Sequence, residues 1–466
     1  MNLTADPEPK PARYGLVVLA IGLAPFLGNL DGSIVMIATP TLARTFHADT
    51  ADVSLVVVAY LLVMAGFSLI FGKLGDRVGT DRVFMAGYAV LTLGSVLCGL
   101  APGLGALVAF RVVQAVGGTM LCATYCALIA SNLPENVRGR AFGFTSVLSS
   151  VGFAIGAPVG GYILEASSWH WLFLLNVPFG LAGLFLSWKH LRRERPACPE
   201  KTPWDTRGAV LSLLALLSLV SALQLGQQSG WVAPLPLALF GVTLACAAAF
   251  VVRERTFPHP LVAPAIFRDA ATGMAILSAL LVLLILDGLL FVFPYYLEVV
   301  KGLASDRSGL VLMALPAAIF VFSPLAGYLS DKRSPRLITS LSGAGLFVGT
   351  SLFLFCDART PLAYVVAAFA VFGVSFAFFL TANVTFIMGR AEPGVRGVLS
   401  GVLAVINNVG ALLGVAVFQV VFALGAAGPA APSVLAVRGF QRAALLAVAL
   451  SVPILLNALF GRTKRP

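Results

Sequence analysis

Charged residues are scarce in this chain. Asp, Glu, Lys and Arg together make up 11% of its 466 residues, whereas a soluble domain usually carries about 25%. Apolar residues make up 59% of the sequence, and the mean hydropathy is +0.95. A chain of this composition has too little polar surface to dissolve around a single core. We therefore expect an all-α membrane protein that crosses the bilayer many times.

Residues that usually build reactive centres are also few. The four histidines fall in predicted loops or at predicted membrane interfaces, and the six cysteines show no metal-ligand spacing with histidines or acidic residues. Cys122 and Cys126 lie one helical turn apart, which suits small packing residues better than a binding site. No nucleophile–base pair or cofactor-binding loop is visible. The sequence therefore predicts neither an enzyme nor a metal site nor a bound cofactor.

Fourteen apolar runs are each long enough to span a bilayer as a helix, which takes about 20 residues. If the N-terminus is cytoplasmic, inner segments hold 24 Lys and Arg residues and outer segments hold six. This excess of inner positive charge predicts that both termini are cytoplasmic, and it explains the net charge of +11 without a nucleic-acid partner. The predicted spans are 14–41, 51–72, 83–101, 104–131, 138–164, 169–188, 208–227, 233–252, 270–297, 308–329, 337–356, 361–388, 397–424 and 438–460.

Polar segments divide these spans into two groups of six, with one pair between them. The predicted order is a cytoplasmic N-terminus (1–13), a first six-helix bundle (14–188), a cytoplasmic linker (189–207), two inserted helices (208–252), a second cytoplasmic linker (253–269), a second bundle (270–460) and a cytoplasmic tail (461–466). Because the longest polar connection is nineteen residues, no soluble domain is expected.

Short features of the first group return in the second group at nearly constant spacing. Asp31-Gly32 is followed by Asp287-Gly288, Asp76 by Asp331, Val137-Arg138-Gly139 by Val395-Arg396-Gly397, and Gly152 and Gly156 by Gly410 and Gly414, at offsets of 255 to 258 residues. Four matches in the same order indicate two copies of one six-helix unit. Such repeats are typical of secondary transporters, whose substrate site lies between the repeats near the bilayer midplane.

Three charges fall inside predicted spans. Asp31 is the one charged residue between Arg13 and Arg44, and a charge in hydrocarbon costs at least about 2.5 kcal/mol even on lenient insertion scales. Asp31 is expected ~13 Å, Arg111 ~10 Å and Asp287 ~15 Å from the outer ends of their helices. At these depths Asp31 and Arg111 can pair. A buried acid that parts from an arginine in one state can exchange its charge for a proton there. Asp31, Arg111 and Asp287 are therefore candidates for proton coupling or substrate binding, and a structural ion pair is the alternative for Asp31.

The loop between the second and third spans carries the most specific motif. Residues 72–79 read GKLGDRVG and match the pattern G-x-L-x-D-R-x-G. By this motif the chain resembles the major facilitator superfamily over essentially its whole length, and its fourteen spans resemble the drug:proton antiporter branch. The resemblance implies two six-helix bundles with two extra helices between them. It also implies a cytoplasmic gate loop, whose residues are Gly72, Asp76, Arg77, Gly79 and Arg82.

Further motifs support the same resemblance. Arg111 to Gly117 is similar to R-x-x-Q-x-x-G, whose arginine takes part in proton transfer in that family. Residues 169–178 resemble the pattern W-R-W-x-F-x-x-N-x-P, for which we expect interfacial anchoring by aromatic side chains. The fifth span is similar to G-x-x-x-G-x-P-x-G-G, which marks exporters. Its motif residues are Gly152, Gly156, Pro158, Gly160 and Gly161.

Together, the residues and the resemblance predict a proton-coupled antiporter of the bacterial inner membrane that exports amphipathic, cationic compounds as a monomer. Its partners are a small-molecule substrate, protons and the lipid bilayer, and a proton gradient takes the place of a cofactor. Two alternatives remain: an exporter of one endogenous metabolite or antibiotic, and a transport-inactive sensor or scaffold. Five amides are candidates to line the cavity, although each can equally form an interhelical hydrogen bond: Gln114, Asn383, Asn407, Asn408 and Gln419.

Overall fold

The computed structural model describes residues 11–48, 50–191, 205–258, 262, 269–303, 305–392, 395–426 and 432–460. Within these ranges the chain is helical and contains no β-strand. The described part of the chain contains fourteen helices that are long and apolar enough to cross a membrane, so the predicted all-α polytopic fold is confirmed. The N-terminal residues 1–10, the linker residues 192–204 and the tail 461–466 lie outside the described residues.

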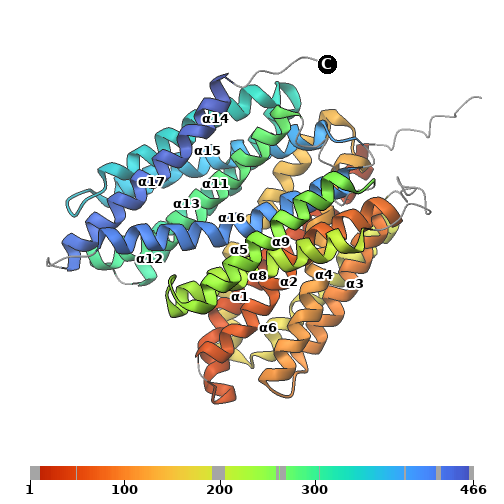
Figure 1. Ribbon diagram of the computed structural model, residues 1–466, viewed down its shortest axis with the longest axis horizontal. Coiled ribbons are helices and arrows are strands. Elements are labelled where there is room, and N and C mark those ends of the chain that lie inside the picture. The colour runs from red at the N-terminus through yellow and green to blue at the C-terminus, as the bar shows by residue number, and fades with distance from the viewer. Residues whose placement is uncertain are drawn as a thin grey trace, which may run out of the picture.

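The first bundle (red to yellow in Figure 1) contains α1 to α7. Its helices are α1 (Pro11–Phe46), α2 (Thr50–Val78), α3 (Thr80–Gly99), α4 (Leu104–Asn132), α5 (Glu135–Ala166), α6 (His170–Leu174) and α7 (Asn176–His190). The predicted span 169–188 is therefore broken at Leu175. Pro178 is the third residue of α7, and its missing N–H and ring make it suited to the first turn of a new helix.

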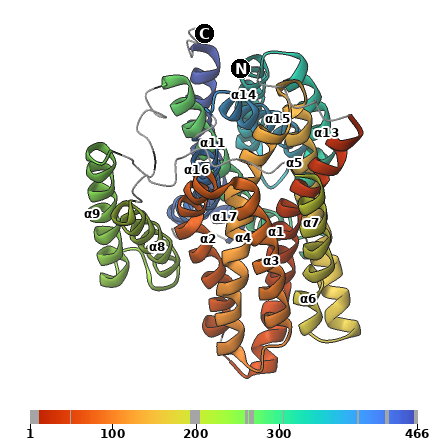
Figure 2. The same ribbon diagram turned by 90° about the vertical axis from the view of Figure 1, so that its right-hand side faces the viewer.

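The inserted helices α8 (Thr206–Ser229) and α9 (Pro234–Thr256) form a hairpin at the side of the molecule. Figure 2 shows α9 outermost, with α8 between it and the bundles. The face of α8 that carries Leu213 and Leu217 packs against Gly66 of α2. Helix α8 also contacts α16 of the second bundle, so the hairpin lies against both halves.

The second bundle contains α11 to α17, and it repeats the first with additional irregular turns. Its elements are α11 (Ala270–Tyr295), a π-helical turn (Tyr296–Val300), α12 (Ser305–Leu312), α13 (Ala314–Lys332), α14 (Pro335–Leu352), a 3₁₀ turn (Phe353–Phe355), α15 (Leu362–Gly389), α16 (Arg396–Gly425) and α17 (Pro432–Phe460). The predicted span 308–329 is broken at Met313. Pro316 again occupies the third position of the following helix, as Pro178 does in α7.

The helix ends also correct one expectation. The first span was predicted to end near residue 41, but α1 continues to Phe46. Asp31 therefore lies fifteen residues before the end of its helix, or ~22 Å instead of the expected ~13 Å. Because α4 begins at Leu104, Arg111 is still ~10 Å from the end of its own helix. Helix α1 thus extends well beyond the neighbouring end of α4. Figure 2 shows the start of α1 and the end of α17 at the same end of the bundles.

Candidate functional site

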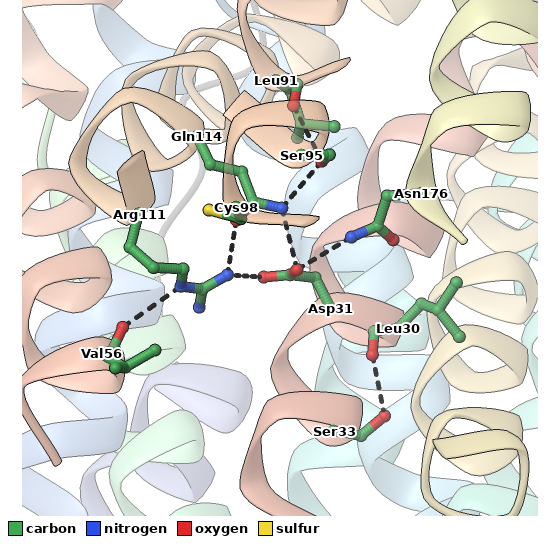
Figure 3. Close-up of polar contacts among 10 residues, drawn as sticks. All are labelled: Leu30, Asp31, Ser33, Val56, Leu91, Ser95, Cys98, Arg111, Gln114 and Asn176. Carbon is green, nitrogen blue, oxygen red and sulfur yellow. Dashed lines mark hydrogen bonds and ion pairs between the residues drawn. The ribbon is translucent and has the colours of Figure 1, made fainter. Parts of the chain in front are cut away.

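A buried ion pair joins α1 to α4 in the first bundle. Arg111 Nη1 lies 2.7 Å from Asp31 Oδ2, and the two residues are 2% and 3% exposed. Figure 3 shows the two side chains pointing directly toward each other between their helices. The structure therefore brings together two of the three charges that the sequence places inside predicted spans.

Two amides complete the hydrogen bonds of the Asp31 carboxylate. Gln114 Nε2 donates to Asp31 Oδ1 at 3.0 Å, and Asn176 Nδ2 donates to the same oxygen at 2.9 Å. The carboxylate thus accepts one charged and two neutral hydrogen bonds, from α4 and α7. A buried charge is tolerated only when it is paired and hydrogen-bonded in this way, so the observed arrangement fits the ionised form of Asp31.

Arg111 is held by further contacts on its other sides. Its Nε donates to the carbonyl oxygen of Val56 at 3.2 Å, and its Nη1 also donates to Gln114 Oε1 at 2.7 Å. The guanidinium carbon lies 4.4 Å from the ring centroid of Tyr60 and 5.7 Å from that of Phe173. Aromatic faces attract a cation, so the guanidinium has favourable partners from α2 and α6 as well as from α1.

Asn176, Ser95 and Tyr60 belong to this network but were not predicted from the sequence. Ser95 Oγ accepts a hydrogen bond from Gln114 Nε2 at 2.9 Å and donates one to the carbonyl oxygen of Leu91 at 2.9 Å. Asn176 lies in the aromatic-rich stretch that was interpreted as an interfacial anchor. An amide inside an apolar run is a signal that could have identified it, because such a group needs a polar partner inside the membrane.

The predicted glycine motif of α5 holds the segment of α1 that carries Asp31. A Cβ atom at Gly152 would overlap the carbonyl oxygen of Phe26, and one at Gly156 would overlap Ser33 Oγ and lie 3.0 Å from the carbonyl oxygen of Leu30. These contacts lie on either side of Asp31 along α1. Two other motif residues do not take part: Gly161 faces open space, and Pro158 is exposed inside α5. The fifth motif residue, Gly160, lies at ordinary van der Waals distance from Ile34.

Replacing Gly152 by alanine is expected to reduce transport at least tenfold, and overpacking of this kind typically destabilises a protein by about 1–3 kcal/mol. The added methyl group meets backbone atoms of α1, which cannot move aside as a side chain can. Transport rate in vesicles and thermal unfolding in detergent measure the two effects. Gly161→Ala is the matched control on the same helix, with a transport rate close to that of the unmodified protein. Equal behaviour of the two variants would contradict the assigned contact.

The second bundle repeats this packing but not the ion pair. A Cβ atom at Gly410 of α16 would lie 3.0 Å from Leu283 Cβ, and one at Gly414 would lie 3.0 Å from the backbone nitrogen of Gly288, next to Asp287. Helix α11 therefore rests on glycines of α16 as α1 rests on α5. Asp287 itself is partly buried, and none of the hydrogen bonds or ion pairs within the described residues involves its carboxylate.

Helix packing identifies the counterparts of Arg111 and Gln114 in the second bundle. A Cβ atom at Gly94 would meet the backbone of Gln114, and one at Gly349, 255 residues further on, would lie 3.0 Å from Cα of Phe372. This equivalence aligns Gln114 with Phe372 at an offset of 258 and therefore Arg111 with Phe369. Both phenylalanines are buried. The second copy thus keeps the acid but has aromatic rings in place of the arginine and the glutamine.

The predicted gate loop joins the two bundles at one end of the molecule. Asp76 accepts hydrogen bonds from the backbone N–H groups of Gly397 and Val398 at 2.7 and 2.8 Å, in the first turn of α16. These N–H groups have no partner within their own helix, and the helix dipole favours a negative charge beside them. A Cβ atom at Gly72 would lie 2.5 Å from the carbonyl oxygen of Gly397, so the glycine allows the two helices to approach closely.

The other residues of the predicted gate loop differ in conformation and exposure. Gly79 connects α2 directly to α3 with φ 108°, a conformation that favours glycine. Arg77 is half-buried and Arg82 is exposed. In the repeat-related position, Asp331 accepts hydrogen bonds from the backbone of Gly139 at 2.6 Å and from the backbone N–H and Nε of Arg140, each at 3.0 Å. Each bundle therefore contributes one acid that binds backbone N–H groups of the other bundle.

Comparison with known proteins agrees with this geometry. The family model described as "Major Facilitator Superfamily" matches residues 21–415. The chain belongs to the Major Facilitator Superfamily. It is therefore a membrane transporter of small molecules and not an enzyme.

Similar members of the Major Facilitator Superfamily are named for different substrates. The chain is 30% identical to the riboflavin transporter RibZ of Clostridioides difficile over 410 residues, covering 88% of each protein. It is 29% identical to the multidrug resistance protein Stp of Mycobacterium tuberculosis, covering 88% of this chain and 76% of that protein. The solved structure of the proton:xylose symporter XylE has a similar fold, with a TM-score of 0.67 at 13% identity over 97% of both chains.

The other predicted cavity amides of this Major Facilitator Superfamily transporter do not join the network around Asp31. Asn383 is buried and donates to the carbonyl oxygen of Ala275 at 2.9 Å, which is the interhelical alternative. Asn408 donates to the carbonyl oxygen of Ala404 within α16 at 2.9 Å. Asn407 is exposed. Gln419 is half-buried, and its Oε1 has no hydrogen-bond partner within the described residues.

Proposed function

We propose that this transporter is a proton-coupled antiporter that exports amphipathic, cationic compounds across the bacterial inner membrane, with both termini in the cytoplasm. The observation that carries the proposal is the buried pair of Asp31 and Arg111, 2.7 Å apart. Stability alone does not require such a pair, since apolar residues of similar volume often stabilise a protein equally or better. Protonation can neutralise Asp31, and this change of charge can link the ion pair to transport.

In this proposal, proton coupling follows because ionised Asp31 needs more hydrogen-bond donors than protonated Asp31. The ionised carboxylate accepts hydrogen bonds from Arg111, Gln114 and Asn176, which come from two other helices. A protonated Asp31 carries no charge and no longer holds Arg111 electrostatically, so α4 can move relative to α1. Exchange of substrate for a proton at opposite sides of the membrane then uses the inward proton gradient to drive export.

Asp287 is proposed to meet the positive charge of the substrate. It lacks a resident partner within the described residues, and the counterpart of Arg111 in its bundle is Phe369. A carboxylate inside a membrane protein is stabilised when a cation binds near it. In this division of roles, the first bundle carries the proton and the second bundle carries the charge of the substrate.

Replacing Asp287 by asparagine is expected to weaken binding of tetraphenylphosphonium ten- to a hundredfold, because a charge-assisted contact of about 1.5–3 kcal/mol is lost. Binding of the neutral analogue triphenylphosphine oxide should change less than twofold. Equilibrium binding to purified protein in detergent measures both affinities. Asp287→Glu should retain cation binding, and Asp357→Asn, in an exposed loop, is the control. An unchanged affinity for the cation in Asp287→Asn would remove Asp287 from the substrate site.

A second candidate function is transport of one metabolite, and the similarity to the riboflavin transporter RibZ favours it. Riboflavin is uncharged, so it would not need the carboxylate of Asp287. The similarity to multidrug resistance protein Stp supports the broader substrate range. Direct competition between riboflavin and tetraphenylphosphonium for the purified protein separates the two candidates.

Inverted membrane vesicles with an acidic interior test the proposed function. Added tetraphenylphosphonium should release protons from vesicles that contain the transporter and leave control vesicles unchanged. A panel of amphipathic cations and riboflavin extends the test to substrate range. If no compound moves protons, proton-coupled antiport is wrong.

A further inference from the structure

Asn176 contacts the Asp31 carboxylate from the first residue of α7, next to the break at Leu175. Its Nδ2 donates to Asp31 Oδ1 at 2.9 Å, and the residue is 1% exposed. Its Oδ1 is buried and has no hydrogen-bond partner among the residues that the structure describes. A buried amide oxygen without a partner is costly, so its presence beside a titratable acid calls for an explanation.

Gln114, the other amide at this carboxylate, has no spare acceptor. Its Nε2 donates to Asp31 and Ser95. Its Oε1 accepts from Arg111 Nη1 at 2.7 Å and lies 3.7 Å from the thiol sulfur of Cys98. Of the two amides in contact with Asp31, Asn176 alone therefore has an oxygen that is available for a new hydrogen bond (Figure 3).

Protonation of Asp31 creates a need for such an oxygen. A proton on Asp31 Oδ1 forms an O–H group that points toward two N–H donors, and a donor facing a donor is unfavourable. Half a turn of the Asn176 amide about its Cβ–Cγ bond exchanges Nδ2 for Oδ1. The N–H···O⁻ bond is then replaced by an O–H···O=C bond at the same place, and the acid remains hydrogen-bonded.

We propose that Asn176 is a positioning residue that follows the protonation state of Asp31, donating to the carboxylate and accepting from the acid. The inference rests on the proposed function, in which Asp31 takes up a proton from the outer side during transport. Arg111 does not lose all its partners in the protonated state, because it still donates to Gln114 Oε1 and to the carbonyl oxygen of Val56. On α7, only the orientation of the Asn176 amide differs between the two protonation states.

Among the described residues, three other titratable groups face Asp31. Arg111 faces it from α4, Tyr60 from α2 and Cys98 from α3. The part of α5 that packs against α1 here presents Gly152 and Gly156, and α7 presents Asn176 itself. A shift in the pH dependence of transport on changing Asn176 therefore reports on its contact with Asp31.

The test is the pH profile of tetraphenylphosphonium-driven proton release in inverted vesicles. Asn176→Leu removes the donor and the acceptor and keeps the number and branching of the side-chain heavy atoms. The lost bond to the charged form is about twice as strong as the lost bond to the neutral form, so the midpoint of the profile should move to higher pH by about one unit. Asn383→Leu is the matched control: it removes an equally buried asparagine that bonds a backbone carbonyl, and it should lower the rate without moving the midpoint.

The outcomes separate this inference from the proposed function. Unmodified transporter that releases protons, together with an unshifted midpoint in a folded Asn176→Leu variant, would overturn the role of Asn176 alone. Absence of proton release from the unmodified transporter would overturn both. Infrared difference spectra of the unmodified protein keep the test independent of variant folding. At low pH these spectra should contain a carboxylic acid band at the frequency of an acid whose O–H donates a hydrogen bond, and this band should be absent from Asp31→Asn. A band at the frequency of a carboxylic acid without a hydrogen bond would overturn the inference.

Discussion

Replacing Arg111 by leucine is expected to lower the free energy of unfolding by about 3–5 kcal/mol, the usual cost of breaking a buried ion pair from one side. The substitution leaves Asp31 inside the first bundle without its charged partner, which lies 2.7 Å away in the folded protein. It also removes the hydrogen bonds that Arg111 donates to the carbonyl oxygen of Val56 and to Gln114 Oε1. Denaturant unfolding of the purified transporter in detergent measures the loss.

Two further variants show whether the loss arises from the ion pair. The double variant Asp31→Asn/Arg111→Leu removes both charges and should recover more than half of the lost stability. Arg390→Leu breaks the ion pair between Arg390 and Asp269, two side chains that are 37% and 39% exposed. This substitution should lower the free energy of unfolding by at most about 1 kcal/mol. A loss below about 1 kcal/mol for Arg111→Leu would mean that the buried pair is not an integral part of the folded bundle.

Replacing Gly72 by valine should reduce transport to a few per cent of the unmodified rate. A Cβ atom at Gly72 would lie 2.5 Å from the carbonyl oxygen of Gly397 and 3.1 Å from Cα of Gly401. Both neighbours are backbone atoms of the other bundle, so the helices cannot approach closely enough for Asp76 to reach the N–H groups of α16. Alternating access needs this closed arrangement once in every cycle. Substrate transport in vesicles measures the effect.

The reactivity of cysteines introduced near Gly72 measures whether the two bundles close at this end of the molecule. In Gly72→Val, cysteines introduced at the ends of α2 and α16 that carry Gly72 and Gly397 should react with a water-soluble thiol reagent faster than in the unmodified background. Gly241→Val is the matched control, because Gly241 lies in the inserted helix α9 and a Cβ atom there meets nothing within 4 Å. Unmodified transport rates in Gly72→Val would show that the contact of α2 with α16 is dispensable.

Much of the fold could be predicted from the sequence. Apolar runs of the required length mark all fourteen spans, since a membrane helix has a strong and local signature. The breaks at Leu175 and Met313 were missed, because a proline three residues into a helix is compatible with either a kink or a new start. The end of α1 was placed too early, near residue 41, whereas the helix continues to Phe46.

The site was only partly predictable. Asp31 and Arg111 stand out as charges in apolar runs. The depth estimate that paired them, however, placed the end of α1 near residue 41 and not at Phe46. Their contact depends on how far α1 extends beyond α4, and the sequence does not contain that distance. Asn176 was missed because its relation to Asp31 exists only after α7 packs against α1. The counterparts Phe369 and Phe372 became identifiable only when equivalent glycine contacts fixed the alignment of the two copies.

Substrate exchange and gradient-driven transport, measured side by side in vesicles that contain Asp31→Asn, test the coupling role of Asp31 most directly. Asparagine retains the size of the side chain and can bind its neighbours, but it cannot exchange a proton. The predicted result is that tetraphenylphosphonium exchange at equal concentrations remains within tenfold of the unmodified rate, while accumulation driven by a pH gradient is lost. Accumulation equal to that of the unmodified transporter would contradict proton coupling through Asp31.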